Sequence, residues 1–240
     1  MQLLVTRPEP DGSRQAKALA DLGHSVLLEP LLEISFEADG ALDFDGVQGL
    51  IATSRNGLRA LETAAGPVPE DMPLYAVGEA SACKARELGF KTVHEGPGDG
   101  AGLAALVCDK ATPGEGALLH LAGEHLASDL KGRLEMAGFD VRQPVLYRAR
   151  ARAGLSAPVC AALSSGGIEG VILMSPRSAK IYQSLLDQSD LTKAAQCAVH
   201  FCLSEAVAAQ LTPALVQSVR TSVRPREDDL FVLIAREAAE

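Results

Sequence analysis

Short runs of apolar residues alternate along the chain with longer segments in which apolar residues recur at helical spacing. The apolar runs lack strict alternation, which is typical of strands covered by helices on both faces. They predict strands at residues 3–6, 25–29, 50–53, 74–77, 118–121, 141–145, 171–174, 199–203 and 219–223. The intervening segments predict helices at residues 11–22, 56–64, 79–88, 102–110, 125–137, 157–165, 176–186, 205–211 and 227–238. Alternation of this kind predicts an α/β protein with parallel sheets.

The chain also repeats itself weakly. Residues 11–32 and 128–147 both run from a helix through a glycine and a strand to a proline followed by further apolar residues. The glycines that follow these helices, Gly23 and Gly138, are typical of helix ends. Two further pairs of segments resemble each other, residues 51–57 with 172–179 and residues 75–82 with 201–208. This self-similarity predicts two related α/β lobes.

Pro30 and Pro144 indicate how the lobes connect. Proline cannot donate to a strand ladder, so the extended residues beyond each proline cannot continue a central strand. We therefore expect residues 33–37 and 146–151 to form a two-stranded linker ribbon. One lobe then consists of residues 1–32 together with 152–240, and residues 38–145 form an inserted second lobe.

Composition narrows the class of protein. The 240 residues are 47% hydrophobic and 22% charged, which is typical of a globular chain with a sizeable core. The formal net charge of −9 argues against binding to nucleic acid or to an anionic membrane. No apolar run approaches the ~18 residues of a membrane helix, and no signal peptide is visible. The five cysteines are scattered without a Cys-x-x-Cys motif, so we expect a cytoplasmic protein with reduced thiols and no metal site.

Turns rich in serine, threonine, arginine and glycine follow many of the predicted strands. In open parallel sheets ligands bind at this edge, where helix N-termini attract anions. Serine and threonine also cap helices there, and at any single position capping is the simpler interpretation. Recurrence in both halves favours ligand binding, with two loop edges facing one another across a cleft. The candidate ligand-binding residues are Thr6, Arg7, Ser54, Arg55, Asn56, Gly78, Ser81, Gly123, Arg148, Ser175, Arg177, Ser178 and Ser204.

The arginines among these candidates indicate an anionic ligand. Each one alone is a surface charge, but together they would give an acidic protein a locally positive cleft suited to a carboxylate-rich molecule. Tyr147 lies in the second predicted ribbon strand, where the floor of such a cleft is expected. Its simpler interpretation is a packed aromatic side chain with a solvated hydroxyl.

Residues 96–101, Gly-Pro-Gly-Asp-Gly-Ala, superficially match a dinucleotide-binding turn. Pro97 between the first two glycines would remove an amide that should face pyrophosphate. We therefore interpret this segment as a loop.

The ordered set of short motifs resembles the uroporphyrinogen-III synthase family over essentially the whole chain. In the first half the resemblance rests on Leu-Leu-Val-Thr-Arg-Pro at residues 3–8, Pro-Leu-Leu-Glu-Ile at 30–34, Thr-Ser-Arg-Asn-Gly at 53–57 and Ala-Val-Gly-Glu-Ala-Ser-Ala at 76–82. In the second half it rests on Gly-Phe-Asp-Val at 138–141, Leu-Tyr-Arg at 146–148, Met-Ser-Pro at 174–176 and Ser-Glu at 204–205.

The resemblance implies two flavodoxin-like lobes joined by a two-stranded ribbon, with the active site in the cleft. It implies cyclisation of linear hydroxymethylbilane to uroporphyrinogen III, with loss of water and inversion of the last pyrrole ring, and without metal or cofactor. Tyr147 matches the ribbon tyrosine suggested to help the hydroxyl depart, and Ser54, Ser81 and Ser175 match cleft hydroxyls. We expect a cytoplasmic monomer that contacts hydroxymethylbilane synthase transiently.

The sequence departs from the family at Ala122, where many relatives carry arginine, and at Leu203 and Ser204, where some carry glycine. These departures concern individual carboxylate contacts. Two other functions are compatible with the pattern. One is a non-enzymatic bilobal binding protein for an anionic metabolite, which would close on its ligand without controlling any product isomer. The other is a nucleotide-dependent transferase, which requires the loop at residues 96–102 to hold phosphate.

Overall fold

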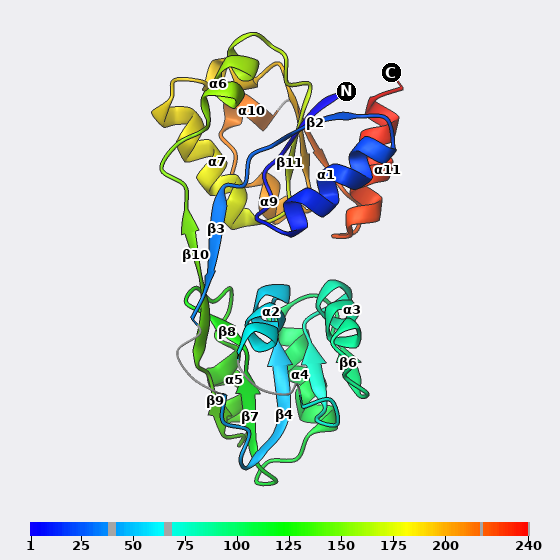
Figure 1. Ribbon diagram of the computed structural model, residues 1–240, viewed down its shortest axis with the longest axis vertical. Coiled ribbons are helices and arrows are strands. Elements are labelled where there is room, and N and C mark those ends of the chain that lie inside the picture. The colour runs from blue at the N-terminus through cyan, green and yellow to red at the C-terminus, as the bar shows by residue number, and fades with distance from the viewer. Residues whose placement is uncertain (38–41, 65–68, 217, 240) are drawn as a thin grey trace. The chain divides into compact units, whose positions relative to one another are not determined.

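The computed structural model describes residues 1–37, 42–64, 69–216 and 218–239. The chain divides into two compact units (Figure 1). Unit 1 comprises residues 1–33 and 150–240, and unit 2 comprises residues 34–149. Each unit has its own sheet and its own apolar core, so each is described separately.

Unit 1 is built on a five-stranded parallel sheet. Its strands are β1 (Gln2–Val5), β2 (Ser25–Leu28), β11 (Gly170–Leu173), β12 (Val199–Cys202) and β13 (Val219–Thr221), paired in the order β13-β12-β11-β1-β2. Strand β11 is buried along its whole length because it lies at the centre and has helices on both faces. A side chain at Gly170 would lie 2.7 Å from Leu3 and from Phe201, so glycine lets these two large neighbours meet above the sheet.

Helices cover both faces of this sheet. Leu19 of α1 (Asp11–Asp21) and Leu230 of α11 (Glu227–Glu237) pack with the β-strand side chains of one face. The core on the other face includes Leu163 and Tyr182. Its helices are α6 (Ala157–Ser164), α7 (Pro176–Gln188), α8 (Thr192–Ala195), α9 (Glu205–Ala208) and α10 (Pro213–Val216).

Unit 2 has a second five-stranded parallel sheet. Its strands are β4 (Val47–Ala52), β5 (Leu74–Ala76), β6 (Val93–Glu95), β7 (Ala117–His120) and β9 (Val141–Arg142), paired in the order β6-β5-β4-β7-β9. Helices α2 (Arg55–Thr63) and α3 (Glu79–Glu87) pack on one face, and α4 (Gly100–Lys110) and α5 (Leu130–Met136) on the other. A Cβ at Gly57 would lie 2.3 Å from the carbonyl oxygen of Leu121, so the close approach of α2 to this strand end requires glycine.

The two units share one topology in permuted form. In unit 1 the strands taken in chain order give the flavodoxin-like arrangement 2-1-3-4-5. Unit 2 gives the same arrangement when β7 is taken as the first strand and β9, β4, β5 and β6 follow. Strand β4 then corresponds to β11 and β5 to β12, which are the segments that resemble each other in sequence. The α/β fold with parallel sheets in two lobes is thus confirmed, and the weak repeat reflects a circular permutation.

A third, three-stranded sheet has the order β3-β10-β8. It consists of β3 (Leu32–Phe36), β8 (Ala122–Gly123) and β10 (Val145–Ala151). The chain leaves unit 1 through β3 and returns through β10. Backbone hydrogen bonds continue just beyond the ends of β3, from Glu37 N–H to the Leu146 carbonyl at 2.8 Å and from Arg152 N–H to the Leu31 carbonyl at 3.0 Å.

Several local expectations were wrong, and the strand expected at residues 141–145, for example, ends at Arg142. The helix expected at residues 125–137 begins only at Leu130, because the Asp129 side chain accepts the Gly132 N–H at 2.9 Å and caps the helix there. Edge strand β6 was missed because it has only one apolar residue among Val93, His94 and Glu95. The ring of His94 stacks on that of Tyr75 in the neighbouring strand, with centroids 5.0 Å apart.

Candidate functional site

The carboxyl ends of β1 and β11 form the topological switch point of unit 1, where doubly wound sheets bind their ligands. Thr6 lies directly after β1, but it is buried, and its hydroxyl donates to the Ile172 carbonyl at 2.7 Å. The Thr6 side chain therefore ties the two central strands together and is not offered to a ligand. Thr6, which was predicted to contact a ligand, therefore has a structural role in unit 1.

Two of the predicted serines open helix α7. Ser175 is its N-cap and accepts the Ser178 N–H at 3.1 Å, and the two serine hydroxyls are 2.9 Å apart. Ser178 is buried, whereas Ser175 is partly exposed. Ser204 occupies the N-cap position of α9 but its side chain makes no capping hydrogen bond. Capping thus accounts for the Ser175 hydroxyl and leaves that of Ser204 available.

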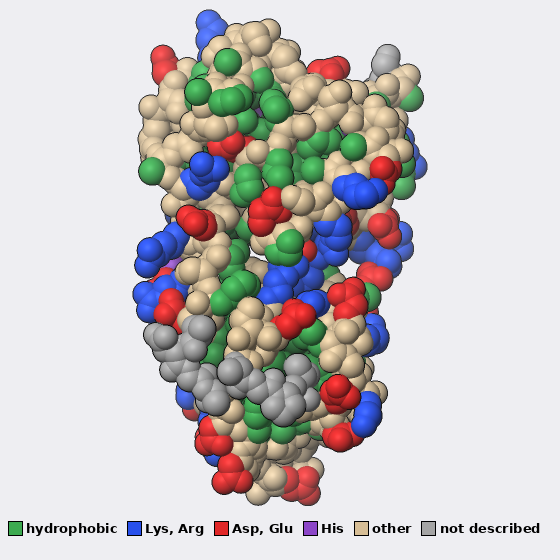
Figure 2. All heavy atoms as spheres, viewed as in Figure 1, with side chains coloured by type: hydrophobic (Ala, Val, Ile, Leu, Met, Phe, Trp, Pro, Cys, Tyr) green, Lys and Arg blue, Asp and Glu red, His purple; other side chains and the backbone are tan. Residues whose placement is uncertain are grey.

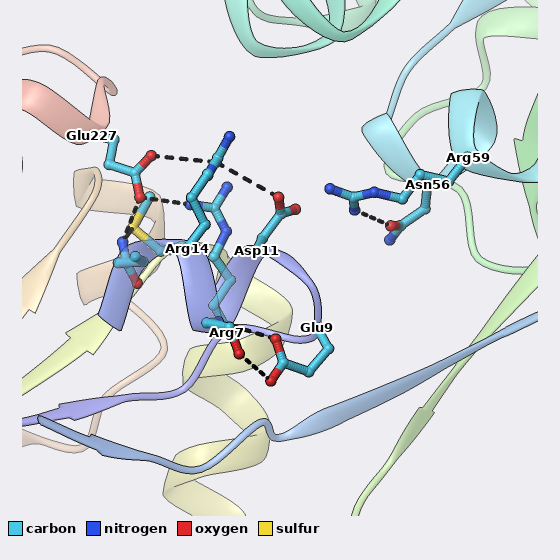
Figure 3. Close-up of polar contacts among 10 residues, drawn as sticks. Arg7, Glu9, Asp11, Arg14, Asn56, Arg59 and Glu227 are labelled. Atoms are coloured by element: carbon cyan, nitrogen blue, oxygen red, sulfur yellow. Dashed lines mark hydrogen bonds and ion pairs between the residues drawn. The ribbon is translucent and has the colours of Figure 1, made fainter. Parts of the chain in front are cut away.

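Arg7 is paired with a carboxylate from the far end of the chain (Figure 3). Its Nη1 lies 2.9 Å from Oε1 of Glu227 at the start of α11, and Arg14 lies 3.6 Å from the other carboxylate oxygen. Gln15 donates to the same Glu227 oxygen as Arg7, at 2.8 Å. On the face drawn in Figure 2, acidic side chains lie beside basic ones. The positive charge of Arg7 is therefore balanced within unit 1.

In unit 2 the corresponding switch point lies between the carboxyl ends of β4 and β7. Ser54 caps α2 by accepting the Asn56 N–H at 3.1 Å, and the Asn56 side chain accepts from Arg59 at 2.8 Å (Figure 3). The Thr53 hydroxyl lies 3.0 Å from Nε2 of His120, the last residue of β7. Arg55 and Asn56 are partly buried at this edge.

The glycine loop next to this edge is folded back on β5. Gly96 N–H donates to the Ala76 carbonyl at 2.8 Å and Gly98 N–H to the Val77 carbonyl at 2.7 Å. Asp99 caps α4 by accepting the Gly102 N–H at 2.8 Å, which places a carboxylate where a phosphate would bind. Gly78, the N-cap of α3, packs against Gly98, and a Cβ added there would lie 3.2 Å from its Cα. This geometry disfavours the nucleotide hypothesis.

Tyr147 in β10 lies against the backbone of β8. The two strands pair in parallel with Tyr147 opposite Gly123, and a Cβ on Gly123 would lie 2.5 Å from the Tyr147 Cζ. The ring therefore occupies the space that a side chain at residue 123 would fill. Tyr147 is only partly buried, and no hydrogen bond to its hydroxyl occurs within the described ranges.

Arg148, next to Tyr147, lies between two carboxylates of unit 2. Its guanidinium is 2.8 Å from Glu37 and 3.5 Å from Glu124. The pairing holds Arg148 beside the Tyr147 strand, and a ligand carboxylate would have to compete with these partners. Ser81 is buried in the first turn of α3.

Comparison with known proteins decides the family. A sequence model of the family described as uroporphyrinogen-III synthase HemD matches residues 13–232. The chain belongs to the uroporphyrinogen-III synthase family. No curated protein matches the sequence. Among solved structures, the fold is similar to a uroporphyrinogen-III synthetase from Helicobacter pylori, with 18% identity, coverage of 98% of both chains and a TM-score of 0.64. It is also similar to a mutant uroporphyrinogen III synthase from Thermus thermophilus, with 17% identity, full coverage of both chains and a TM-score of 0.59.

Membership of the uroporphyrinogen-III synthase family confirms the resemblance read from the motifs. The activity of the family, a cyclising lyase reaction that converts hydroxymethylbilane to uroporphyrinogen III, is therefore the function of this chain in tetrapyrrole biosynthesis. Nothing in the described fold favours a non-catalytic binding protein. No helix in the described part of the chain is long and apolar enough to cross a membrane. Among the residues that the structure describes, no three His, Cys, Asp or Glu side chains are grouped so that they could hold a metal ion.

The structure thus groups the predicted synthase residues by unit. The carboxyl edge of the unit 1 sheet carries Thr6, Arg7, Ser175, Arg177, Ser178 and Ser204, and that of the unit 2 sheet carries Ser54, Arg55, Asn56, Gly78 and Ser81. Gly123 and Arg148 lie in the third sheet, in β8 and β10. His120, which is 1% exposed, and its partner Thr53 were not among the predicted site residues. The sequence does contain a sign of this network, because His120 is a polar residue at the end of the otherwise apolar strand β7.

Proposed function

We propose that Tyr147 donates the proton with which the hydroxyl of hydroxymethylbilane departs as water. The supporting observation is the position of its ring on the Gly123 backbone, beyond the carboxyl end of β7, with a hydroxyl that has no protein partner among the described residues. The contact with Gly123 limits where the ring can lie, and the hydroxyl has a proton available to a ligand.

The chemistry requires only modest acid catalysis. The electron-rich terminal pyrrole expels the hydroxyl as the C–O bond breaks, and the Tyr147 proton completes the water molecule. The resulting azafulvene is attacked by the ring-D carbon that already carries a substituent, which gives a spiro intermediate. Fragmentation and reclosure invert ring D, and the proton lost when the pyrroles regain aromaticity balances the one that left with water.

Isomer choice depends on holding one folded conformer of a flexible polyanion, because unassisted closure at the free carbon gives the type I isomer. Positioning of this kind needs many weak contacts rather than a covalent nucleophile. We assign this positioning to the hydroxyl, backbone amide and guanidinium groups at the carboxyl edge of each sheet. The proposed contacts are Ser54, Arg55, Asn56, Gly78, Ser81, Gly123, Ser175, Arg177, Ser178 and Ser204.

Arg7 and Arg148 are expected to bind the substrate more weakly than an unpaired arginine would. Both are paired with carboxylates, so a substrate acetate or propionate binds them only in competition with Glu227, or with Glu37 and Glu124. The exchange of one carboxylate partner for another lowers the net gain from each arginine.

The Tyr147→Phe variant tests the assignment. We expect its kcat to fall severalfold or more with an unchanged thermal unfolding midpoint, because only the hydroxyl is removed. Tyr75→Phe is the matched control, since Tyr75 is buried in the core of the same unit. A wild-type rate for Tyr147→Phe in an assay coupled to hydroxymethylbilane synthase would remove Tyr147 from this role.

The enzyme is further proposed to act as a cytoplasmic monomer that takes its substrate by transient contact with hydroxymethylbilane synthase. Its free cysteines, three of them exposed, suit a reducing compartment. Size-exclusion chromatography with light scattering, with and without hydroxymethylbilane synthase, tests the oligomeric state and the contact.

A further inference from the structure

His120 links three segments of unit 2 through two hydrogen bonds. Its Nε2 lies 3.0 Å from the Thr53 hydroxyl and its Nδ1 lies 3.1 Å from Oε1 of Gln143. Thr53 follows β4, His120 ends β7, and Gln143 follows β9. The mechanism described above does not use this network.

The partners of His120 determine the direction of both hydrogen bonds. Because an amide oxygen faces Nδ1, that nitrogen carries the proton and donates it to Gln143. Nε2 is then the acceptor, and the Thr53 hydroxyl donates its proton to it. Burial lowers the pKa of His120, which keeps the ring neutral and preserves this pattern at neutral pH. With its proton directed inward, Thr53 Oγ1 has lone pairs to offer and no proton to give.

The network lies where a ligand is expected. Strands β4 and β7 flank the switch point of the sheet, and Thr53 immediately precedes Ser54. His120 is buried whereas Thr53 is partly exposed, so the network runs from the core to the carboxyl edge. Within the residues that the structure describes, no group donates a hydrogen bond to Thr53 Oγ1.

This inference rests on the proposed function. We propose that Thr53 Oγ1 accepts a hydrogen bond from a pyrrole N–H of the linear tetrapyrrole, and that His120 is the positioning residue that keeps this oxygen an acceptor. The backbone amides, serines and arginines at the sheet edges are donors suited to the substrate carboxylates. The pyrrole N–H groups need an acceptor instead, since a donor buried without one is costly.

Unit 1 contains a second histidine that lies between two hydrogen-bonding side chains, and one of them, Ser218, is partly exposed. His200 lies between the Tyr182 hydroxyl and the Ser218 hydroxyl, at 3.3 Å from each, and is fully buried. The Ser218 hydroxyl donates to the Leu215 carbonyl at 3.0 Å, so this network ends on the backbone of unit 1 and provides a comparison for His120.

Steady-state kinetics with hydroxymethylbilane generated in situ test the proposal. The Thr53→Val and His120→Leu variants should each lower kcat/KM roughly threefold to tenfold, the effect of one lost hydrogen bond. The double variant should be no worse than the less active single variant, because His120 acts only through the Thr53 oxygen. Thr53→Ser and His120→Gln should restore most of the activity, since Ser retains the hydroxyl and the Gln carbonyl can occupy the place of Nε2.

Two control variants separate positioning from folding. Thr63→Val removes a hydroxyl that bonds the Ala60 carbonyl within α2, and His200→Gln disrupts the buried network of unit 1. Both should leave kcat/KM unchanged, and His200→Gln should lower the unfolding midpoint. Long-range ¹⁵N–¹H spectra should show the Nδ1–H tautomer of His120.

Three results would overturn the proposal: an unchanged kcat/KM in Thr53→Val, effects of the two single variants that multiply in the double variant, or an Nε2–H tautomer. Failure of the proposed function gives a different result, because Tyr147→Phe would then keep the wild-type kcat whatever the Thr53 and His120 variants do.

Discussion

The Gly123→Ala substitution tests whether the placement of Tyr147 matters to the reaction. An added Cβ would lie 2.5 Å from the Tyr147 Cζ, 2.6 Å from Cε2 and 2.9 Å from the hydroxyl oxygen. Carbon atoms in ordinary contact are about 3.5 Å apart, so the ring must retreat by about 1 Å. A displacement of that size can cost on the order of 100-fold in rate when the group takes part in the reaction.

The ring lies at a partly exposed position, so it can move without large loss of stability. We expect Gly123→Ala to lower kcat by one to two orders of magnitude, while overpacking costs about 1 kcal/mol of unfolding free energy. Urea unfolding and the coupled synthase assay measure the two effects separately. Gly154→Ala is the matched control, because no atom of the described residues lies within 4 Å of an added Cβ there. A wild-type kcat in Gly123→Ala would show that the position of the Tyr147 ring does not affect the reaction.

Three further predictions concern buried and paired charges. Burial lowers the pKa of His200 from 6.5 to about 4, so the free energy of unfolding should be constant above pH 6.5 and fall by about 3 kcal/mol as the pH drops to 4. His200→Gln should weaken this pH dependence in urea unfolding, and an equal pH dependence in both proteins would contradict the prediction. Glu29 is buried and accepts the N–H and the hydroxyl of Ser156, the N-cap residue of α6, at 2.8 and 2.7 Å. Glu29→Ala should therefore lower the free energy of unfolding by about 2 to 3 kcal/mol, and a loss below about 0.5 kcal/mol would contradict the prediction. Glu227→Gln should free Arg7 to bind a substrate carboxylate, which lowers KM and makes KM depend more steeply on salt concentration. A raised KM would show instead that Glu227 holds Arg7 in the position in which it binds substrate.

Much of the fold was predictable because its central strands are apolar on both faces. Strands such as β4 and β11 were located to within a few residues, since buried parallel strands produce continuous apolar runs. Helix-ending glycines were equally clear, and Gly23 and Gly138 have the positive φ angles that favour glycine. Edge strand β6 and the two-residue β8 leave too little pattern to detect.

The candidate site was less predictable, because residue type does not reveal how a side chain is paired. The sequence indicates that Thr6 and Arg7 follow a strand at the ligand-binding edge. It does not indicate that the Thr6 hydroxyl is bound to the backbone of β11 or that Glu227, near the other end of the chain, neutralises Arg7. Tyr147 was identified by its motif, while its contact with Gly123 depends on a parallel pairing between β8 and β10 that only the structure supplies.

The most direct test of the account is the isomer composition of the product. Hydroxymethylbilane is generated in situ, the purified protein is added, and the uroporphyrins are separated after oxidation. We expect predominantly the type III isomer, at a rate that rises with protein concentration. Exclusive formation of the type I isomer at every protein concentration would contradict it.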